Sequence, residues 1–306
     1  PNPRVGCVIV SARGEVLAEG WHQGAGTPHA EVAALAALRA EGGEARGATV
    51  YTTLEPCNHW GRTGPCSRAL AEAGVARVVY ALTDPNPAAS GGAHHLASQG
   101  VEVEGDVDTR RAIVLNRAWV HALSKGRPYV TLKLASTMDG RVAAPDGSSQ
   151  WITGPEARRH AHRQRANSDA IVVGTGTYLA DRPRLTARRE DGSLYPHQPL
   201  RVVVGERDIE DLGLLRIPSH CPSHVLKVLA EREVRHVMLE GGPILAAAFA
   251  RAALIDAVHL YLAPALLGGG LASVANLGIE SVDQALRWRT RKVQRVGNDV
   301  FVEVGR

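Results

Sequence analysis

Residues 53–66 read TLEPCNHWGRTGPC, and an alanine-rich stretch upstream, residues 27–40, reads TPHAEVAALAALRA. Together they place His29, Cys57 and Cys66 in an order that can supply three ligands to a tetrahedral Zn²⁺. With three protein ligands the fourth position stays open for water, which is typical of a catalytic zinc site. Glu31, two residues after the histidine, is free to move protons.

The local pattern around these residues supports a site built on helix starts. Residues 30–40 predict a helix, and Thr27-Pro28 mark its beginning, so His29 and Glu31 lie on its first turn. Residues 50–54 predict a strand that ends at the first cysteine, and Gly64-Pro65 open a second helix at Cys66. A helix N-terminus lowers a thiol pKa and suits thiolate ligation.

The order H-x-E…P-C…C is the zinc-deaminase signature, although the usual spacing is C-x2-C and here eight residues separate Cys57 from Cys66. Buried thiols or a disulfide are the alternatives, but a disulfide suits secreted proteins. A structural zinc site is also possible, with His59 as a fourth ligand. We expect the catalytic site, with Glu31 as its proton carrier.

Composition limits the class of protein. The 306 residues are 44% hydrophobic and 22% charged, which indicates a globular enzyme long enough for two domains. No run of eighteen apolar residues predicts a membrane span. A net charge of +4, 4% aromatics and no Lys/Arg run argue against nucleic acid as a partner. Four cysteines favour a reducing compartment, and we expect the cytoplasm. Pro1 reads as a trimmed N-terminus that would hide any targeting segment.

Strand and helix patterns alternate along the chain, which predicts an α/β fold with three-layer packing in the first half. Residues 5–10 and 15–19 flank a hairpin turn at Arg13-Gly14, and residues 108–123 predict one helix. A boundary falls near residues 124–128, before a strand at 129–135. The predicted domains are residues 1–124 and residues 125–306.

Six stretches distributed along the chain carry a family resemblance. They are residues 53–66, 1–6 (PNPRVG), 84–87 (DPNP), 133–141 (KLASTMDGR), 149–153 (SQWIT) and 239–243 (LEGGP). With these motifs the chain resembles, over nearly its whole length, the bifunctional deaminase/reductase family of bacterial riboflavin biosynthesis. The long cysteine spacing with its internal Gly-Arg-Thr is specific to that family among zinc deaminases.

The resemblance implies a cytidine-deaminase-like domain followed by a dihydrofolate-reductase-like domain. The first would deaminate 2,5-diamino-6-(5-phosphoribosylamino)pyrimidin-4-one with Zn²⁺. The second would reduce the ribosyl group of the product to ribityl with NADPH. The partner is then a small phosphorylated pyrimidine, and we expect a homo-oligomer. A zinc nucleoside or nucleic-acid deaminase with an inactive or differently specific reductase-like domain is the alternative.

The resemblance also assigns site residues. Cofactor contacts fall on Ala135, Trp151, Thr177, Asp181, Gly242, Pro243, Ile244, Leu245, Ala246, Ala247 and Ala248. Substrate contacts fall on Ser149, Arg165, Leu185, Arg188 and Glu240 in the reductase half, and on Asn2, His59 and Arg62 in the deaminase half.

Each assignment has a simpler alternative. Asn2 could be a turn residue, and Trp151 could be a core residue. His59, Arg62 and Thr63 could form a solvated loop rather than a phosphate grip. His22 is expected at the surface or behind the ligands.

Arg165 and Arg188 present planar forks that can clamp a phosphate. Gly241-Gly242, ahead of a helix at 243–251, form an anion site suited to a cofactor phosphate. Residues 171–177 predict a strand entering a glycine loop that lacks the third glycine of a dinucleotide fingerprint.

One stretch departs from the family. Residues 205–223 are short, and Gly205-Glu206 replace the Asp-Ser that often follows this strand. This stretch normally helps to cover the adenosine end of the cofactor, so the preference for NADPH over NADH depends on it.

Overall fold

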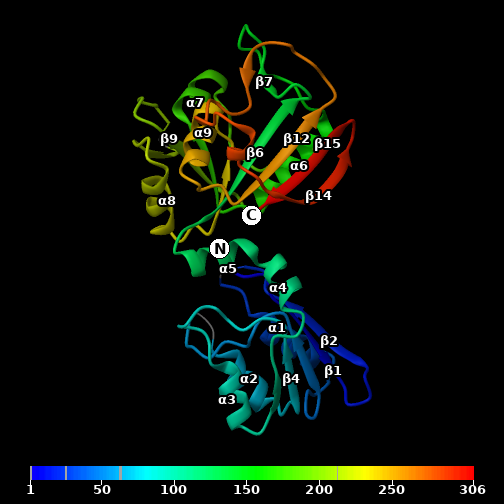
Figure 1. The fold of residues 1–306 in the computed structure, drawn as a ribbon. Coiled ribbons are helices and arrows are strands. Elements are labelled where there is room, and N and C mark those ends of the chain that lie inside the picture. Colours follow the sequence, from blue (N-terminus) through cyan, green and yellow to red (C-terminus); the bar gives the residue numbers. More distant parts are fainter. Residues whose placement is uncertain (1, 25, 62–63, 212) are drawn as a thin grey trace. The chain divides into compact units, whose positions relative to one another are not determined.

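The computed structural model describes residues 2–24, 26–61, 64–211 and 213–306. The chain divides into two compact units, Pro1–Lys125 and Gly126–Arg306 (Figure 1). In the described part of the chain, every helix is too short or too polar to cross a membrane.

The first unit is built on a five-stranded sheet of order β2-β1-β3-β4-β5. The β1 strand pairs antiparallel with β2 and β3, and β3, β4 and β5 run parallel. The strands are β1 (Gly6–Val10), β2 (Val16–Trp21), β3 (Thr49–Thr52), β4 (Arg77–Tyr80) and β5 (Glu102–Glu104). The helices are α1 (Ala30–Ala40), α2 (Cys66–Glu72), α3 (Gly92–Ser98), α4 (Thr109–Leu115) and α5 (Arg117–Lys125).

Helix α1 is held unusually close to the sheet. Its buried side chains Ala34 and Leu38 follow helical spacing and pack with Ile9 and Val50. A Cβ at Gly20 would lie only 2.3 Å from the backbone nitrogen of Ala34, so only glycine allows this approach. The contact fixes the start of α1, where His29 and Glu31 lie, against the sheet.

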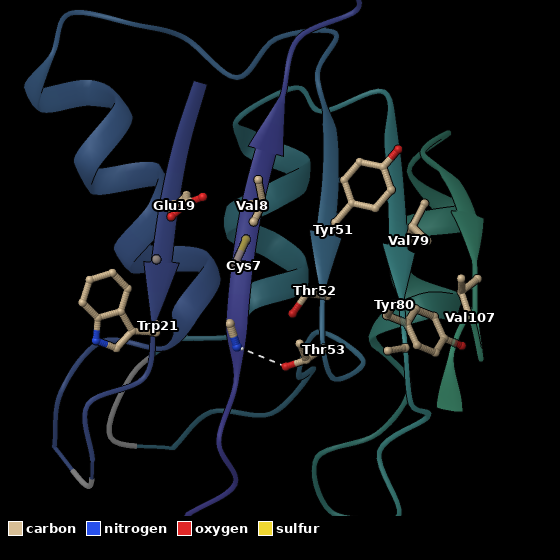
Figure 2. A pocket seen from close by; sticks show the side chains of 13 residues that line it. Cys7, Val8, Glu19, Trp21, Tyr51, Thr52, Thr53, Val79, Tyr80 and Val107 are labelled. Carbon is tan, nitrogen blue, oxygen red and sulfur yellow. Dashed lines mark hydrogen bonds between the residues drawn. The ribbon is translucent and has the colours of Figure 1, made fainter. Parts of the chain in front are cut away.

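The other face of the same sheet carries an open hollow of about 430 Å³. Figure 2 shows Val8, Tyr51 and Val79 on this face, with the helices behind the sheet. Trp21 and Tyr51 are exposed here, with 60% and 45% of their surface accessible. The candidate zinc ligands are not among the residues that line it.

The single helix predicted over residues 108–123 is wrong, because two helices, α4 and α5, meet at Asn116. The Asn116 side chain is buried and bonds to the backbone of Arg4, accepting from its N–H at 2.7 Å and donating to its carbonyl at 3.0 Å. Asn116 thus links the helical end of the unit to the segment before β1 at a break in the helix.

The second unit contains an eight-stranded sheet of order β10-β9-β8-β11-β6-β12-β15-β14. The first six strands are parallel and the last two are antiparallel to their neighbours. The sheet strands are β6 (Tyr129–Thr137), β8 (Ala170–Gly174), β9 (Leu200–Val204), β10 (Leu215–Ile217), β11 (His236–Leu239), β12 (Ala257–Ala263), β14 (Arg289–Val296) and β15 (Asp299–Gly305). Strands β7 (Arg141–Ala143) and β13 (Leu271–Ala272) form a separate pair, and the helices are α6 (Pro155–Ala166), α7 (Thr175–Asp181), α8 (Pro222–Ala230), α9 (Pro243–Arg251) and the 3₁₀ turn Val282–Gln284.

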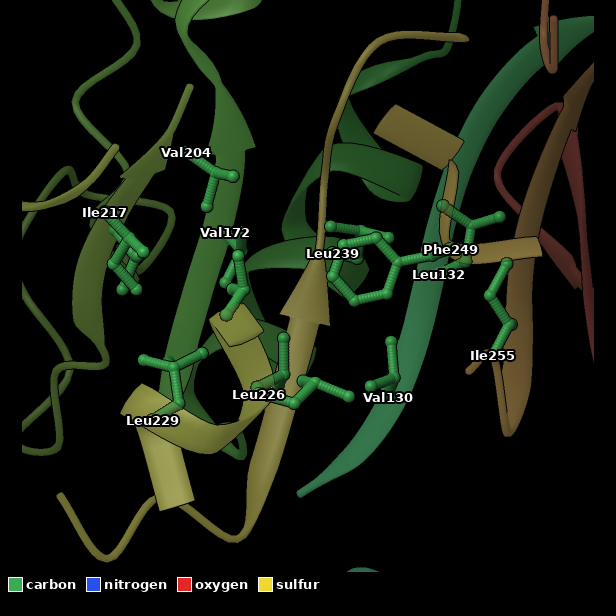
Figure 3. Close-up of a cluster of buried hydrophobic side chains, with 14 of the residues drawn as sticks. Val130, Leu132, Val172, Val204, Ile217, Leu226, Leu229, Leu239, Phe249 and Ile255 are labelled. Atoms are coloured by element: carbon green, nitrogen blue, oxygen red, sulfur yellow. The ribbon is translucent and has the colours of Figure 1, made fainter. Parts of the chain in front are cut away.

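Apolar strands of this unit pack under α8 and α9. One apolar cluster contains Val130, Val172 and Leu239 from three parallel strands, together with Leu229 and Phe249 from the helices (Figure 3). Because parallel strands point their carboxyl ends to one edge, the segments that follow β6, β8, β9 and β11 gather there. Glu240 and Gly242 of the second candidate site follow β11 there, whereas Lys133 lies within β6 and Arg165 lies near the end of α6.

Candidate functional site

The structure brings the three predicted metal ligands of the first unit together. The Nδ1 atom of His29 lies 3.5 Å from the Cys57 sulfur and 3.3 Å from the Cys66 sulfur. All three donor atoms lie within 4.8 Å of one another. A tetrahedral Zn²⁺ with ordinary bond lengths separates a nitrogen from a sulfur ligand by about 3.5 Å, so this donor set fits zinc.

Three separate elements deliver these ligands. His29 is the residue just before α1, Cys66 begins α2, and Cys57 lies in the loop that follows β3. The backbone N–H of Cys66 donates to the Cys57 sulfur at 3.4 Å. Both sulfurs are buried, with at most 8% of either cysteine exposed, which protects thiolates from solvent and oxidants.

Glu31 lies beside the donor atoms, in the first turn of α1, and only 3% of it is exposed. Burial raises the pKa of Glu31 to about 7. Hydrogen bonding to Cys66 and to His29 lowers the pKa of Cys57 to about 4, against the opposing effect of its burial. The cluster therefore combines a thiolate with a carboxyl group that can carry a proton.

One further histidine, His22, packs against a predicted metal ligand. His22 meets His29 edge to face with ring centroids 5.4 Å apart, and its Nε2 lies 2.8 Å from the Asn2 amide nitrogen. His22 therefore contacts the predicted ligand His29, and Asn2 contacts His22. His59 is half-buried, and its Nδ1 atom has no hydrogen-bond partner among the described residues, which do not include residues 62 and 63. Arg62 and Thr63, predicted to grip a phosphate, lie outside the described residues.

In the second unit, Arg165 and Glu240 form a buried two-point ion pair. Nε and Nη2 of Arg165 donate to the Glu240 carboxylate at 2.7 and 2.8 Å, and Nη1 donates to the Thr186 carbonyl at 3.1 Å. Burial alone would raise the pKa of Glu240, but Arg165, Lys133 and His162 outweigh it and lower that pKa to about 2. Three N–H donors of the Arg165 guanidinium are thus occupied by hydrogen bonds within the protein.

Lys133 and Arg188 add positive charge around that pair. Burial lowers the pKa of Lys133, Arg165 adds to the lowering, and Glu240 opposes it. Nη1 of Arg188 donates to the Thr186 hydroxyl at 2.8 Å, and the Arg188 N–H donates to Nδ1 of His162 at 3.3 Å. Arg188 is half-buried, and burial and Arg165 both lower its pKa. A cluster of cationic side chains around one carboxylate suits a phosphorylated substrate.

The predicted glycine turn connects to the predicted cofactor helix. The hydroxyl of Thr177 accepts the N–H of Gly242 at 3.0 Å, which joins α7 to the segment between β11 and α9. Pro243 has no N–H, so the first free donors of α9 belong to Ile244 and Leu245. The Ile244 side chain is 78% exposed, whereas Ala246 and Ala247 are fully buried in the core.

The expected glycine loop at residues 171–177 is wrong in one respect. Strand β8 passes directly into α7 at Thr175, so Gly176 lies inside a helix. Gly174 is the extended residue before that helix. All four of the other strand residues are buried, and the tight βα junction needs no intervening loop.

The remaining predicted contacts vary in exposure. Trp151 is 68% exposed, so it is not a core residue, and Arg158 stacks on its ring at 4.4 Å. Leu185 is buried with a left-handed backbone, at φ 52°. Ala135 and Ser149 are half-buried, and Asp181 is exposed at the end of α7. Within the short stretch after β9, strand β10 pairs with β9 and Arg216 binds Asp208 at 2.8 Å.

Family comparison assigns each half. Residues 1–82 match the model described as the cytidine and deoxycytidylate deaminase zinc-binding region. Residues 128–302 match the model described as the RibD C-terminal domain. A riboflavin biosynthesis protein RibD of Mycobacterium tuberculosis is 48% identical over 313 residues, covering 99% of this chain and 91% of that protein. The chain belongs to the RibD family.

Other RibD proteins agree over the whole chain. The Escherichia coli protein is 39% identical and covers 99% of this chain and 93% of its own length. The Acinetobacter baumannii RibD structure superposes with a TM-score of 0.91 at 36% identity, covering 100% of this chain and 92% of that one. A Thermotoga maritima structure has a TM-score of 0.90 at 32% identity, with the same coverage. The latter is described as a diaminohydroxyphosphoribosylaminopyrimidine deaminase and 5-amino-6-(5-phosphoribosylamino)uracil reductase.

RibD membership accounts for the presence of both units. The chain is a bifunctional enzyme of riboflavin biosynthesis, a zinc-dependent deaminase and an NADPH-dependent reductase. The sequence analysis missed two residues with buried contacts, His162 and Glu55. His162 gave no signal in the sequence, because its contact with Arg188 exists only in the folded chain. Glu55 lies inside the cysteine motif, but its buried hydrogen bonds come from a distant segment.

Proposed function

We propose that residues 1–124 deaminate 2,5-diamino-6-(5-phosphoribosylamino)pyrimidin-4-one at a Zn²⁺ held by His29, Cys57 and Cys66. Residues 125–306 then reduce the ribosyl side chain to ribityl. The observation that carries the first step is the three-donor cluster beside buried Glu31. The Thermotoga relative named for both reactions, at 32% identity over the whole chain, supports the substrate.

The deaminase residues have separate roles in this proposal. When bound, zinc activates a water by lowering its pKa toward about 7. Glu31 would take a proton from the attacking water and pass it to the ring nitrogen. It would then take the proton of the hydroxyl now bonded to the ring carbon and deliver it to the leaving amino group, which departs as ammonia. Its burial against the ligands keeps the carboxyl group within reach of both positions. Asn2, His59 and Arg62 hold the ring and the phosphate.

The reductase residues bind and orient two molecules. NADPH supplies a hydride when bound. Its phosphates lie at the free N–H groups of Ile244 and Leu245, at the start of α9. The other residues assigned to the cofactor are Thr177, Asp181, Gly242, Pro243 and Ala246 to Ala248, with Ala135 and Trp151 against its other end. The free N–H groups and the dipole of α9 favour an anion there. Ser149, Leu185, Arg165, Arg188 and Glu240 hold the substrate.

Within this arrangement Arg188 is the better phosphate ligand of the two arginines. Glu240 and the Thr186 carbonyl already use three donors of Arg165. Arg188 is bound to protein through the Thr186 hydroxyl and lies against His162. Arg165 therefore orients Glu240 toward the ribosyl hydroxyls, while Arg188 carries the phosphate contact.

The coupled reaction tests this function. The zinc-loaded full chain is given the diaminopyrimidine phosphate and NADPH, and ammonia release and NADPH oxidation are followed together. We expect ammonia to appear first and NADPH oxidation to follow in equal amount. Deamination of cytidine or RNA without the pyrimidine phosphate reaction would instead support a nucleoside or nucleic-acid deaminase.

Two coarser properties also belong to the proposal. The four cysteines form no disulfide, which supports a reducing compartment such as the cytoplasm. We propose a homo-oligomer, which sedimentation of the purified chain tests directly.

A further inference from the structure

Glu55 is a buried carboxylate that binds three backbone N–H groups. Its Oε1 accepts from Gly91 and Ala93, both at 3.1 Å, and its Oε2 accepts from Asp84 at 3.1 Å. Only 5% of the residue is exposed. Its own N–H donates to the Leu82 carbonyl at 2.8 Å. Glu55 is therefore fixed from both its main chain and its side chain, two residues before Cys57.

The donors belong to one segment, residues 84–93, which we name the support loop. This loop also contacts the residues on either side of Cys57. The Asn58 N–H donates to the Ala89 carbonyl at 2.9 Å. A Cβ on Gly92 would lie 1.7 Å from the Pro56 carbonyl oxygen, so the two backbones are in direct contact. The support loop thus backs the metal-binding loop at positions 55, 56 and 58.

The loop that carries Cys57 is hydrogen-bonded to the residue that follows the second cysteine. The Ser67 N–H donates to the Cys57 carbonyl at 3.2 Å, and the Ser67 hydroxyl donates to the Asn58 side chain at 2.9 Å. Ser67 is fully buried and follows Cys66 at the start of α2. A shift of the Cys57 loop would therefore change the separation of the two sulfurs.

We infer that Glu55 is a positioning residue that sets the geometry of the Cys57 and Cys66 thiolates and slows the release of Zn²⁺. The inference rests on the proposed zinc site. A carboxylate suits this role because both of its oxygens accept, whereas an amide has only one accepting oxygen. Partners behind metal ligands typically contribute 10- to 100-fold in metal affinity.

Release of zinc from the loaded full chain to a chromogenic chelator measures the effect. Glu55→Gln keeps the shape of the side chain but places an NH₂ group against one N–H donor. We expect release about 10- to 100-fold faster. Gly92→Ala disturbs the contact between the support loop and the metal-binding loop, because the added Cβ collides with the Pro56 carbonyl oxygen. It should also speed the release of zinc. Glu72→Gln, an exposed carboxylate on α2, is the control and should release zinc at the wild-type rate.

The spectrum of the Co²⁺-substituted protein distinguishes positioning from general stability. We expect the sulfur-to-cobalt and d–d bands of Glu55→Gln to shift, because the thiolate geometry changes. Wild-type release rates and spectra in both variants, or a lowered melting temperature with an unchanged spectrum, overturn the inference. If Glu55→Gln does not fold, Ser67→Ala carries the test, with a smaller rise in release rate expected and a wild-type rate contradicting us. Absence of stoichiometric zinc in the wild-type chain would instead contradict the proposed function.

Discussion

The two candidate sites of this chain are assembled in opposite ways. In the first unit, His29, Glu31, Cys57 and Cys66 lie within 38 positions of sequence and form one compact cluster. In the second unit, Arg165 near the end of α6 and Glu240 directly after β11 are 75 positions apart and meet only in the folded chain. The first site is a local motif, and the second is a product of topology.

The difference lies in what each chemistry requires. A metal needs a few specific donor types at short range, and such donors leave a recognisable order in the sequence. Binding two organic molecules needs a shaped, charged surface, which many residue types can provide. Replacing one donor or acceptor atom can therefore inactivate the first site. The second site depends on how the opposite charges of a buried ionic network compensate one another.

The largest expected effect is a loss of ammonia release that leaves the reductase activity unchanged. Glu31→Gln removes the proton carrier but none of the three ligands, so we expect ammonia release to fall about 10²- to 10⁴-fold. Metal analysis should still find one zinc per chain. NADPH oxidation, assayed with substrate that is already deaminated, should stay at the wild-type rate. An active Glu31→Gln enzyme would contradict the assignment of the proton carrier.

A smaller, structural effect is expected in the second unit. Glu240→Gln leaves Arg165 as a buried charge without its carboxylate, which typically costs about 3–5 kcal/mol in unfolding free energy. Thermal unfolding should show the loss in the second unit only, together with loss of the reductase activity. Zinc content and ammonia release serve as the control, because the first unit is unchanged.

The dependence of stability on pH also tests the ion pair of the second unit. The pKa of Glu240 is about 2 in the folded chain against an ordinary value of 4.5, so the unfolded chain binds its proton first as pH falls. The stability that this carboxylate provides is complete above about pH 4.5 and is lost progressively as pH falls toward 2. We expect Glu240→Gln to flatten that part of the stability profile of the second unit. An unchanged acid dependence would contradict the ion-pair account.

The smallest effect concerns substrate affinity. Arg188→Ala removes one charged hydrogen-bond donor, usually worth about 1.5–3 kcal/mol, so KM for the reductase substrate should rise about 10- to 100-fold. Ammonia release should not change. Arg189→Ala is the matched control, because Arg189 is exposed and lies over Tyr195. Equal loss of both activities in Arg188→Ala would indicate misfolding rather than a lost phosphate contact.

Several elements could be predicted from local pattern. The helix at residues 30–40, the strand before Cys57 and the helix at 243–251 all occur in the structure, because their apolar spacing and end signals agree. The break at Asn116 could not be predicted, since it depends on hydrogen bonds to Arg4, more than a hundred residues away. Trp151 could equally have been a core residue until its exposure was seen.

By itself, the sequence determined the zinc chemistry, because ligand identity and order are local properties of residues 29–66. The change of pattern near residue 125 also predicts a two-part organisation. Only the tertiary structure decided that Glu240 neutralises Arg165, that Thr177 joins the glycine turn, and that Glu55 supports the Cys57 loop. These contacts join segments distant in sequence, and no local pattern encodes a partner that only the packing of the chain brings near.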